Sequence, residues 1–312
     1  MTTALDVTFL AADGHELSGT LELPTGQAPH PAALLIVGSG EVDRNSDHPR
    51  LALGVTRELA GALAETGIAS LRYDKRGVGA SGGDHLATTF DDARADAVAA
   101  LAALRAHPAI DHDRVLVIGH SEGALHAASV AADDPTVAGV GLLACPATTG
   151  EATMRWQAER IVPTLPAVVR LLLRVLRQSP ERAQTKLFAR VRATDGAVQR
   201  IQGRKLNVGW LRGFLDHDPA PDLARMRVPV LALTGALDLQ VDPDDLERIA
   251  DLVAPAPVQT HRIPEVNHTL RHSSGTGAPS EYKRQVKTGQ PLDPRVLHTI
   301  TGWAGDRVSV PA

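Results

Sequence analysis

Short apolar runs alternate with helical periods along most of the chain. The runs at 32–37 (Ala-Ala-Leu-Leu-Ile-Val) and 115–118 (Val-Leu-Val-Ile) contain no polar residue, and the first stops at Gly38-Ser39-Gly40. Runs of this kind are typical of strands buried on both faces of a sheet. We predict strands over residues 5–10, 16–23, 32–37, 68–73, 115–118, 137–144, 228–233 and 258–263.

The first two predicted strands flank Asp13-Gly14, a dipeptide that favours a hairpin turn. Helical periods follow at 51–66, 90–105 and 122–132. Gly67 stands where a helix C-terminus favours glycine, and Asp91 and Asp92 lie in the first turn of the second helix, where the helix dipole favours acids. Strands separated by helices imply crossover connections and a mostly parallel sheet, so we predict an α/β fold.

The pattern changes between residues 151 and 222, where we find helical stretches but no convincing strand. One helical stretch, 168–177, places Arg170, Arg174 and Arg177 on one face and apolar residues on the other. We therefore predict a core formed by 1–150 and 223–312, with 151–222 as a helical cap or lid inserted above the ends of the strands.

The predicted cap is basic. It holds 13 Lys and Arg against 7 Asp and Glu, a net charge of +6. Because the whole chain has a net charge of −4, the remaining residues together carry −10. Such a charge favours substrates whose acyl or leaving group is negative. The alternative is that the arginines only solvate the outer faces of amphipathic helices.

Composition excludes several classes of protein. With 312 residues, 43% hydrophobic and 22% charged, the chain has the make-up of a globular enzyme, and its net charge gives no footprint for nucleic acid. A single cysteine, Cys145, cannot form an internal disulfide, and we expect it in the core. We find no basic leader with an apolar run and no segment long enough to cross a bilayer, so we expect a cytoplasmic protein, with a homodimer left open.

The strongest chemical signal is Gly119-His120-Ser121-Glu122-Gly123, which fits G-x-S-x-G between a predicted strand and a predicted helix. A serine at such a turn is held in strained backbone geometry, and glycine two residues to either side avoids a collision. The turn exposes the hydroxyl, and the helix start supplies N–H groups for an oxyanion. We predict Ser121 as nucleophile, with Ser39 and Ser81 in other glycine-rich loops as rivals.

A serine nucleophile needs a base, and the base needs an orienting acid. In this kind of fold the acid follows the serine and the histidine comes last. Asp238 lies on the loop after the predicted strand 228–233 and is our acid. Its rivals Asp242, Asp244 and Asp245 look like the start of the next helix, and Asp216 and Asp218 precede the strand.

Thirteen histidines compete for the role of base. His268 lies on the loop just after the last predicted strand, and we choose it. His272, one turn further on, is its main competitor. For His15, His112, His217 and His261 a turn or strand position is a sufficient explanation.

The oxyanion hole needs two backbone N–H groups. We expect one from Glu122, directly after the nucleophile. The second should come from Gly38-Ser39-Gly40 after the strand 32–37, with Ser39 preferred and Gly40 close behind. A plain glycine turn is the alternative explanation for this segment.

Several segments in order carry a family resemblance: Gly38-Ser39-Gly40 with Asp43-Arg44-Asn45, then Tyr73-Asp74-Lys75-Arg76-Gly77, the Ser121 turn, the Asp238 loop and Asn267-His268. Together they resemble the α/β-hydrolase superfamily, in the branch of serine aminopeptidases and acyl-ester or thioester hydrolases. The resemblance covers about residues 5–305 and implies an eight-stranded sheet, a Ser-Asp-His triad and no cofactor. One departure is Val37-Gly38, where the family usually has His-Gly.

The predicted function is hydrolysis of a carboxylic ester, thioester or small amide of a small-molecule acyl substrate through an acyl-enzyme. Two alternatives from other classes remain: non-hydrolytic chemistry on the same fold, such as a lyase or cofactor-free peroxidase, and a non-catalytic ligand-binding module. Gly77-Val78-Gly79-Ala80-Ser81-Gly82 also fits the dinucleotide motif G-x-G-x-x-G. We reject that interpretation because no helix starts there to hold a phosphate.

Overall fold

An eight-stranded, mostly parallel sheet forms the centre of the molecule. The computed structural model describes residues 2–175, 179–201 and 203–309. The strands run in the order β1-β2-β6-β3-β7-β8-β11-β12, with β1 and β2 antiparallel to their neighbours and the others parallel. Their bounds are β1 Thr3–Leu10, β2 Glu16–Leu23, β3 His30–Ile36, β6 Ala69–Tyr73, β7 Ile110–His120, β8 Gly139–Leu143, β11 Val230–Gly235 and β12 Val258–Ile263. The predicted α/β class and all eight strands are confirmed.

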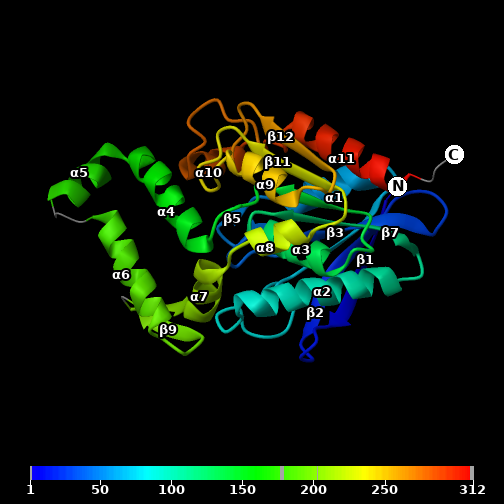
Figure 1. Ribbon diagram of the computed structural model, residues 1–312, viewed down its shortest axis with the longest axis horizontal. Helices are drawn as coiled ribbons and strands as arrows, with labels where there is room; N and C mark the ends of the chain where they lie inside the picture. Colours follow the sequence, from blue (N-terminus) through cyan, green and yellow to red (C-terminus); the bar gives the residue numbers. More distant parts are fainter. Residues whose placement is uncertain (1, 176–178, 202, 310–312) are drawn as a thin grey trace.

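Helices cover both faces of the sheet (Figure 1). On one face α1 (Val55–Glu65) and α11 (Pro294–Val308) pack against each other and the sheet. On the other lie α2 (Phe90–Ala106), α3 (Glu122–Asp133), α8 (Ala220–Arg225) and α9 (Asp245–Val253). Alternate residues of β3 enter the two layers: Leu34 packs with α2 and α3, and Leu35 with α1 and α11. This explains why the central strands are apolar on both faces.

Local signals set several element ends. Gly14 has φ +88° in the turn between β1 and β2, and Gly67 has φ +85° just after α1, where a side chain would be strained. The predicted helix over 51–66 is too long, because 51–52 pair as β5 (Leu51–Ala52) with β4 (Asp47–His48) before α1 begins. Near the C-terminus, η2 (Pro279–Glu281) and α10 (Tyr282–Lys287) follow the loop after β12.

Between β8 and β11, the part of the chain from α4 to α7 forms a helical arm that extends from one end of the molecule (Figure 1). It contains α4 (Gly150–Ile161), η1 (Val162–Thr164), α5 (Ala167–Val175), α6 (Pro180–Arg192) and α7 (Val208–Asp216). A small core of its own joins α6 to α7 through Phe188, Val191, Val208, Leu211 and Leu215. Helix α7 also contacts α2, which ties the arm to the sheet domain. The division at residues 151 and 222 stays a prediction.

One expectation for this segment is wrong. Residues 198–201 and 204–207 form an antiparallel hairpin, β9 (Val198–Ile201) with β10 (Arg204–Asn207). No long apolar run marks it, because both strands lie at the surface and consist only of exposed and half-buried residues. Of the predicted arginine face, Arg170 is exposed on α5, whereas Arg177 lies outside the described residues.

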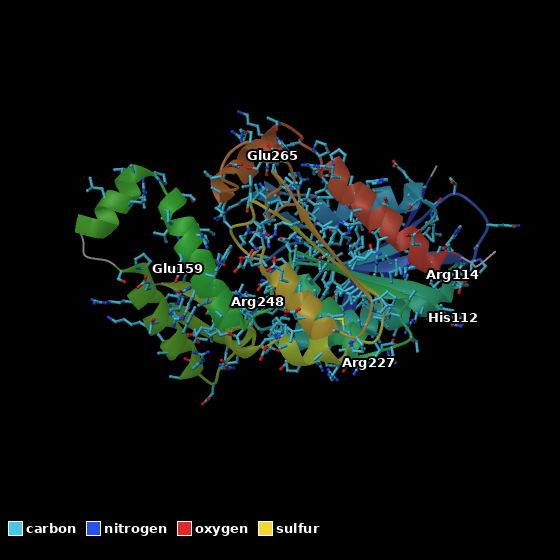
Figure 2. All side chains as sticks on the ribbon, turned by 45° about the horizontal axis from the view of Figure 1, so that its top comes forward. His112, Arg114, Glu159, Arg227, Arg248 and Glu265 are labelled. Atoms are coloured by element: carbon cyan, nitrogen blue, oxygen red, sulfur yellow. The ribbon has the colours of Figure 1, made fainter. Side chains whose placement is uncertain are left out.

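The arm and the beginning of β7 lie at opposite ends of the molecule. In Figure 2, Glu159 marks α4 in the arm, while His112 and Arg114 mark the opposite end, where β7 begins. No helix in the described part of the chain has the length and apolarity that a bilayer crossing requires. The carboxyl ends of β3, β6, β7, β8, β11 and β12 share one edge of the sheet, and that edge carries the candidate site.

Candidate active site

Ser121 lies at a sharp turn between β7 and α3. Its φ of +58° and ψ of −122° fall in a region that side chains rarely adopt. The turn is held because the Ser121 N–H donates to the Leu143 carbonyl at the end of β8, 2.8 Å away. A Cβ at Gly119 would overlap the Gly123 carbonyl, and a Cβ at Gly123 would overlap the carbonyls of Ile36 and Val37. Both glycines of the motif are therefore required by close backbone approach.

Asp238 and His268 form a buried pair across the loops after β11 and β12. His268 Nδ1 lies 2.8 Å from Asp238 Oδ2, and the two residues are 6% and 2% exposed. The other carboxylate oxygen of Asp238 accepts hydrogen bonds from the N–H groups of Gln240 and Val241, at 2.7 and 3.0 Å. A carboxylate held in this way fixes the imidazole ring with Nε2 directed away from the acid.

The rival acids occupy other roles. Asp242 accepts from the Asp244 N–H, Asp244 is the N-cap residue of α9, and Asp245 accepts from the Ala147 N–H and Arg248. His272, the rival base, is exposed. The structure therefore brings together Asp238 and His268 and assigns the competing residues to the start of a helix and to the surface.

His120 connects the serine turn to the histidine loop. Its Nε2 lies 2.9 Å from the His268 carbonyl oxygen, and the two rings are 5.0 Å apart between centroids. In the described residues no hydrogen bond joins the Ser121 hydroxyl to the His268 ring.

Two backbone N–H groups next to the serine are free to bind an oxyanion. Within the described chain, neither Ser39 nor Glu122 has a backbone acceptor for its N–H. Gly38 packs beside the serine, since a Cβ built on it would lie 3.3 Å from the Ser121 Cβ. The turn after β3 therefore lies against the nucleophile turn, where the predicted hole requires it.

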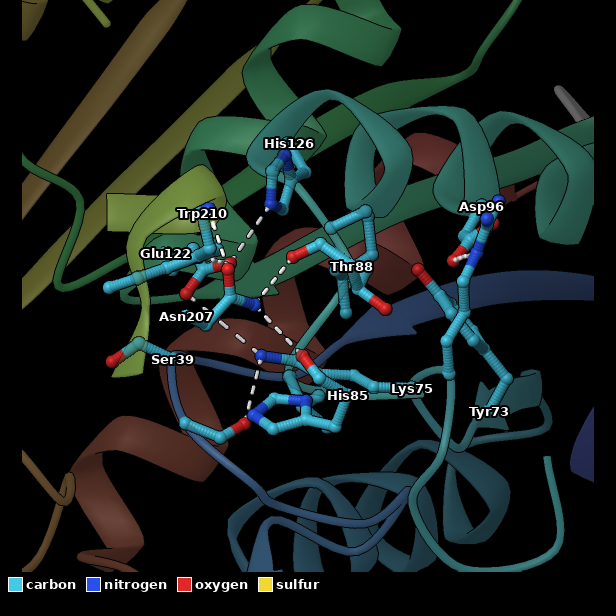
Figure 3. A pocket seen from close by; sticks show the side chains of 15 residues that line it. Ser39, Tyr73, Lys75, His85, Thr88, Asp96, Glu122, His126, Asn207 and Trp210 are labelled. Atoms are coloured by element: carbon cyan, nitrogen blue, oxygen red, sulfur yellow. Dashed lines mark hydrogen bonds and ion pairs between the residues drawn. The ribbon is translucent and has the colours of Figure 1, made fainter. Parts of the chain in front are cut away.

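Behind these two peptides lies an ion pair between half-buried Lys75 and buried Glu122 (Figure 3). Lys75 Nζ donates to the Gly38 carbonyl at 2.5 Å and to the Gly40 carbonyl at 3.4 Å, and lies 3.9 Å from Glu122 Oε2. The Gly38 carbonyl and the Ser39 N–H belong to one peptide unit. One lysine therefore contacts the Ser39 peptide and also pairs with the side chain of Glu122, the residue after Ser121.

The Glu122 side chain is held from several directions. Its Oε1 accepts from Trp210 Nε1 at 3.0 Å and lies 3.2 Å from His126 Nε2. Burial raises the pKa of Glu122, but the Lys75 charge and the His126 and Trp210 hydrogen bonds lower it to about 2. Burial lowers the pKa of Lys75, and the Glu122 charge partly opposes this. We conclude that Glu122 is ionised at neutral pH.

Sequence reasoning missed this network. Lys75 and Glu122 both belong to motifs of the sequence, 73–77 and 119–123. Their side chains come together only because these two segments and the one at 38–40 converge in the fold. The same holds for His120, whose ring reaches the His268 loop, 148 residues away in sequence. The sequence offers one indication of this network. Lys75 lies within Tyr73-Asp74-Lys75-Arg76-Gly77, directly after a strand that ends at the same edge of the sheet as the serine turn.

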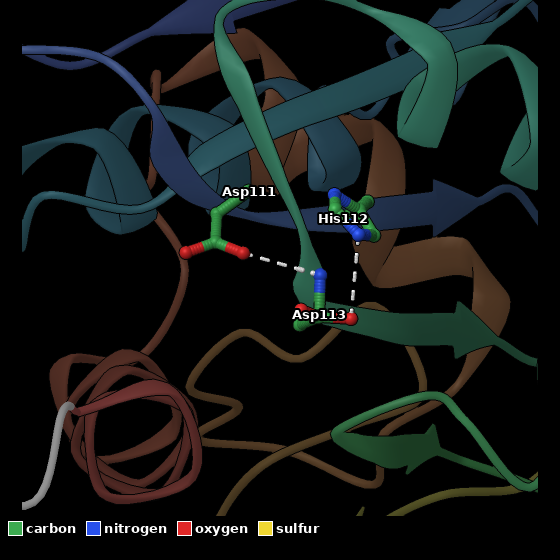
Figure 4. Close-up of side chains that lie close together, drawn as sticks. All are labelled: Asp111, His112 and Asp113. Atoms are coloured by element: carbon green, nitrogen blue, oxygen red, sulfur yellow. Dashed lines mark hydrogen bonds and ion pairs between the residues drawn. The ribbon is translucent and has the colours of Figure 1, made fainter.

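The other conspicuous polar group is not at this edge. Asp111, His112 and Asp113 lie close together at the beginning of β7 (Figure 4). Asp111 already accepts from the Asp113 N–H at 3.2 Å and from Arg114 at 2.7 Å, and His112 and Asp113 are exposed. These contacts account for the group as the solvent-facing start of a strand. The loop Gly77–Gly82 is likewise structural, since Ser81 binds the Asp74 carbonyl and the Ser18 N–H, and α2 begins only at Phe90.

Comparison with known families places this fold and site. Residues 52–273 match the model of the family described as serine aminopeptidase, S33. The chain belongs to this family of α/β-hydrolases, which confirms the resemblance drawn from the motifs.

Curated relatives with similar sequences carry esterase names. Esterase EstD of Thermotoga maritima is 27% identical over 292 residues, which is 92% of this chain and 65% of that protein. Esterase FrsA of Yersinia pestis is 28% identical over 235 residues, 70% of this chain and 49% of that protein. The chain thus spans about half to two thirds of the length of these relatives.

Solved structures share the fold. Est1E of Butyrivibrio proteoclasticus, in a complex described as having ferulic acid bound, superimposes with a TM-score of 0.63 at 17% identity, covering 97% of this chain and 99% of that one. The esterase PF2001 of Pyrococcus furiosus gives a TM-score of 0.62 at 16% identity, covering 98% and 91%. At this identity the likeness concerns the fold alone.

Proposed function

We propose that the protein is a serine esterase in which Ser121, His268 and Asp238 form the catalytic triad. The observation that carries the proposal is the buried Asp238–His268 pair on the loops beside the strained Ser121 turn, joined to it through His120. Family membership and the esterase names of the curated relatives support ester hydrolysis over the lyase, peroxidase and binding-module alternatives.

In the proposed reaction the Ser121 hydroxyl oxygen attacks the carbonyl carbon of the ester, and His268 Nε2 accepts the hydroxyl proton. Asp238 stabilises the imidazolium that forms. The N–H groups of Ser39 and Glu122 bind the negative oxygen of the tetrahedral intermediate. The intermediate collapses when His268 returns the proton to the departing alcohol, which leaves an acyl group on Ser121.

Water then repeats the sequence. His268 accepts a proton from water, the hydroxide attacks the acyl carbon, and the carboxylic acid leaves as Ser121 recovers its proton. Lys75 acts as a positioning residue, because its hydrogen bond to the Gly38 carbonyl orients the Ser39 N–H before charge develops.

A panel of 4-nitrophenyl acetate, a matched thioester and a matched anilide tests the reaction class. The expected result is fastest turnover of the ester, abolished by a serine-reactive phosphonate. The control is Ser121→Ala, which should lower kcat about 10⁶-fold while leaving the melting temperature unchanged, since alanine fits the site of serine. Hydrolysis that survives both treatments would place the chemistry elsewhere.

A further inference from the structure

A cavity of about 240 Å³ adjoins the segment Gly38-Ser39-Gly40, which we call the oxyanion turn (Figure 3). Ser39, Gly40 and Glu122 form its side toward the nucleophile, Ala93 of α2 lies in its wall, and Trp210 of α7 closes it on the side of the arm. For comparison, an engineered apolar cavity of about 150 Å³ in another protein holds benzene. This cavity therefore has room for a substituted ring or a chain of roughly six to eight carbons.

The charged residues in the wall are already paired. Arg76 forms a double hydrogen bond with the Asp96 carboxylate, with one contact of 2.6 Å, and Lys75 pairs with Glu122. Between these pairs the lining includes the apolar side chains of Ile36, Val37, Tyr73, Ala93 and Trp210. The polar residues His85, Thr88, His126 and Asn207 complete it; Asn207 donates to the His85 and Thr88 carbonyls, and His126 lies against Glu122. A charged ligand would lose its hydration without gaining an opposite charge, whereas an apolar ligand loses nothing.

The position of the cavity indicates whether it can bind the acyl group or the alcohol of an ester. The departing alcohol must lie next to His268, because that ring returns the proton to it. The loops that carry Asp238 and His268 lie within residues 236–273, and no residue of this range lines the cavity. A second cavity of about 190 Å³ does contain Ser121 together with Gln240 and Val241 of the Asp238 loop. Ser121 lines only the second cavity, whereas Ser39, Glu122 and Trp210 line both, so the two cavities are neighbours at the oxyanion turn.

We propose that the cavity behind the oxyanion turn is the acyl subsite and that it selects uncharged, apolar acyl groups of about six to eight carbons. The proposal rests on the esterase function above and adds its substrate class. In this proposal the choice of acyl group does not depend on the net positive charge of the arm, because the arginines of the arm do not line the cavity.

The test is a series of 4-nitrophenyl esters from acetate to decanoate. Each methylene buried should raise kcat/KM about fourfold until the cavity is full, near six to eight carbons, after which kcat/KM should level or fall. The adipoyl monoester, which matches hexanoate but ends in a carboxylate, should be hydrolysed at least about 100-fold less efficiently than hexanoate.

A filling variant tests the location. Ala93→Leu adds three carbons inside the cavity and should move the optimum to shorter chains by two to three carbons. Ala93→Val, a smaller addition, should give an intermediate profile even if the leucine variant folds poorly. The matched control is Ala102→Leu, on the exposed side of the same helix, which should keep the wild-type profile.

The outcomes separate the two proposals. Absence of acetate hydrolysis in the wild type would overturn the esterase function and the subsite with it. Normal acetate hydrolysis with a flat chain-length profile, with equal use of the adipoyl ester, or with the same shift in Ala93→Leu and Ala102→Leu would overturn the subsite alone.

Discussion

At the scale of single residues, the site depends on side chains that hydrogen bonds to their neighbours hold in one orientation. Asp238 shows this most clearly, because its two oxygens are divided between His268 and the backbone N–H groups of Gln240 and Val241. The carboxylate cannot turn away from the imidazole without leaving two buried donors unsatisfied. We therefore expect its role to be catalytic more than structural.

Replacing Asp238 by Asn should lower kcat about 10⁴-fold, because an amide that donates to Nδ1 stabilises the wrong imidazole tautomer. The melting temperature should change little, since shape and backbone contacts are kept. Steady-state kinetics on 4-nitrophenyl acetate provide the measurement, with Asp242→Asn as the control that retains wild-type activity. The reverse pattern would make Asp242 the acid.

At the scale of elements, the oxyanion turn depends on three segments that meet at one edge of the sheet. Lys75 follows β6, its carbonyl partners Gly38 and Gly40 follow β3, and Glu122 opens α3. Each strand end was predictable from its apolar run. The convergence was not, because the lysine and the glutamate are 47 residues apart and neither motif specifies the other.

Lys75→Met should lower kcat about 10- to 100-fold with little change in KM, since the Ser39 N–H loses its orientation only where charge develops. It should also destabilise the fold by about 3–5 kcal/mol, because Glu122 is left as an unpaired buried charge. The double variant Lys75→Met, Glu122→Gln removes that charge and should recover stability but not kcat. Recovery of kcat together with stability would show that the lysine is merely structural.

The hairpin β9–β10 illustrates the other limit of prediction from sequence. Strands of the central sheet are recognisable because burial on both faces demands continuous apolar residues. Residues 198–201 and 204–207 include Gln199, Arg200, Arg204 and Lys205 at the surface, so composition alone favours a loop. The motifs at Ser121 and Asp238 were predictable because each follows such an apolar strand. His268 was predictable only from its place on the loop after the last strand, since β12 is largely polar.

At the scale of the whole molecule, stability should depend on pH through buried histidine. Burial and the nearby His268 lower the pKa of His120 to about 4 from its ordinary 6.5. Between these values the unfolded chain binds a proton that the folded chain does not, so the free energy of unfolding falls as pH falls. From pH 7 to pH 5 this single group should cost about 2 kcal/mol.

Urea denaturation at pH 7 and pH 5 measures this loss. His120→Gln cannot titrate yet retains a donor for the His268 carbonyl, so its stability should fall by about 2 kcal/mol less than that of wild type over the same interval. An identical pH dependence in the two proteins would mean that His120 does not carry the effect.

The central claim is that Ser121 forms the covalent intermediate, and the most direct measurement is mass spectrometry of the protein after reaction with a fluorophosphonate. The strained turn, the free N–H of Glu122 and the Asp238–His268 pair all converge on this hydroxyl. We predict one adduct per chain, on the peptide that contains Gly119–Gly123, and none on Ser121→Ala. An adduct on Ser39 or Ser81, or labelling of the alanine variant, would contradict the proposed mechanism.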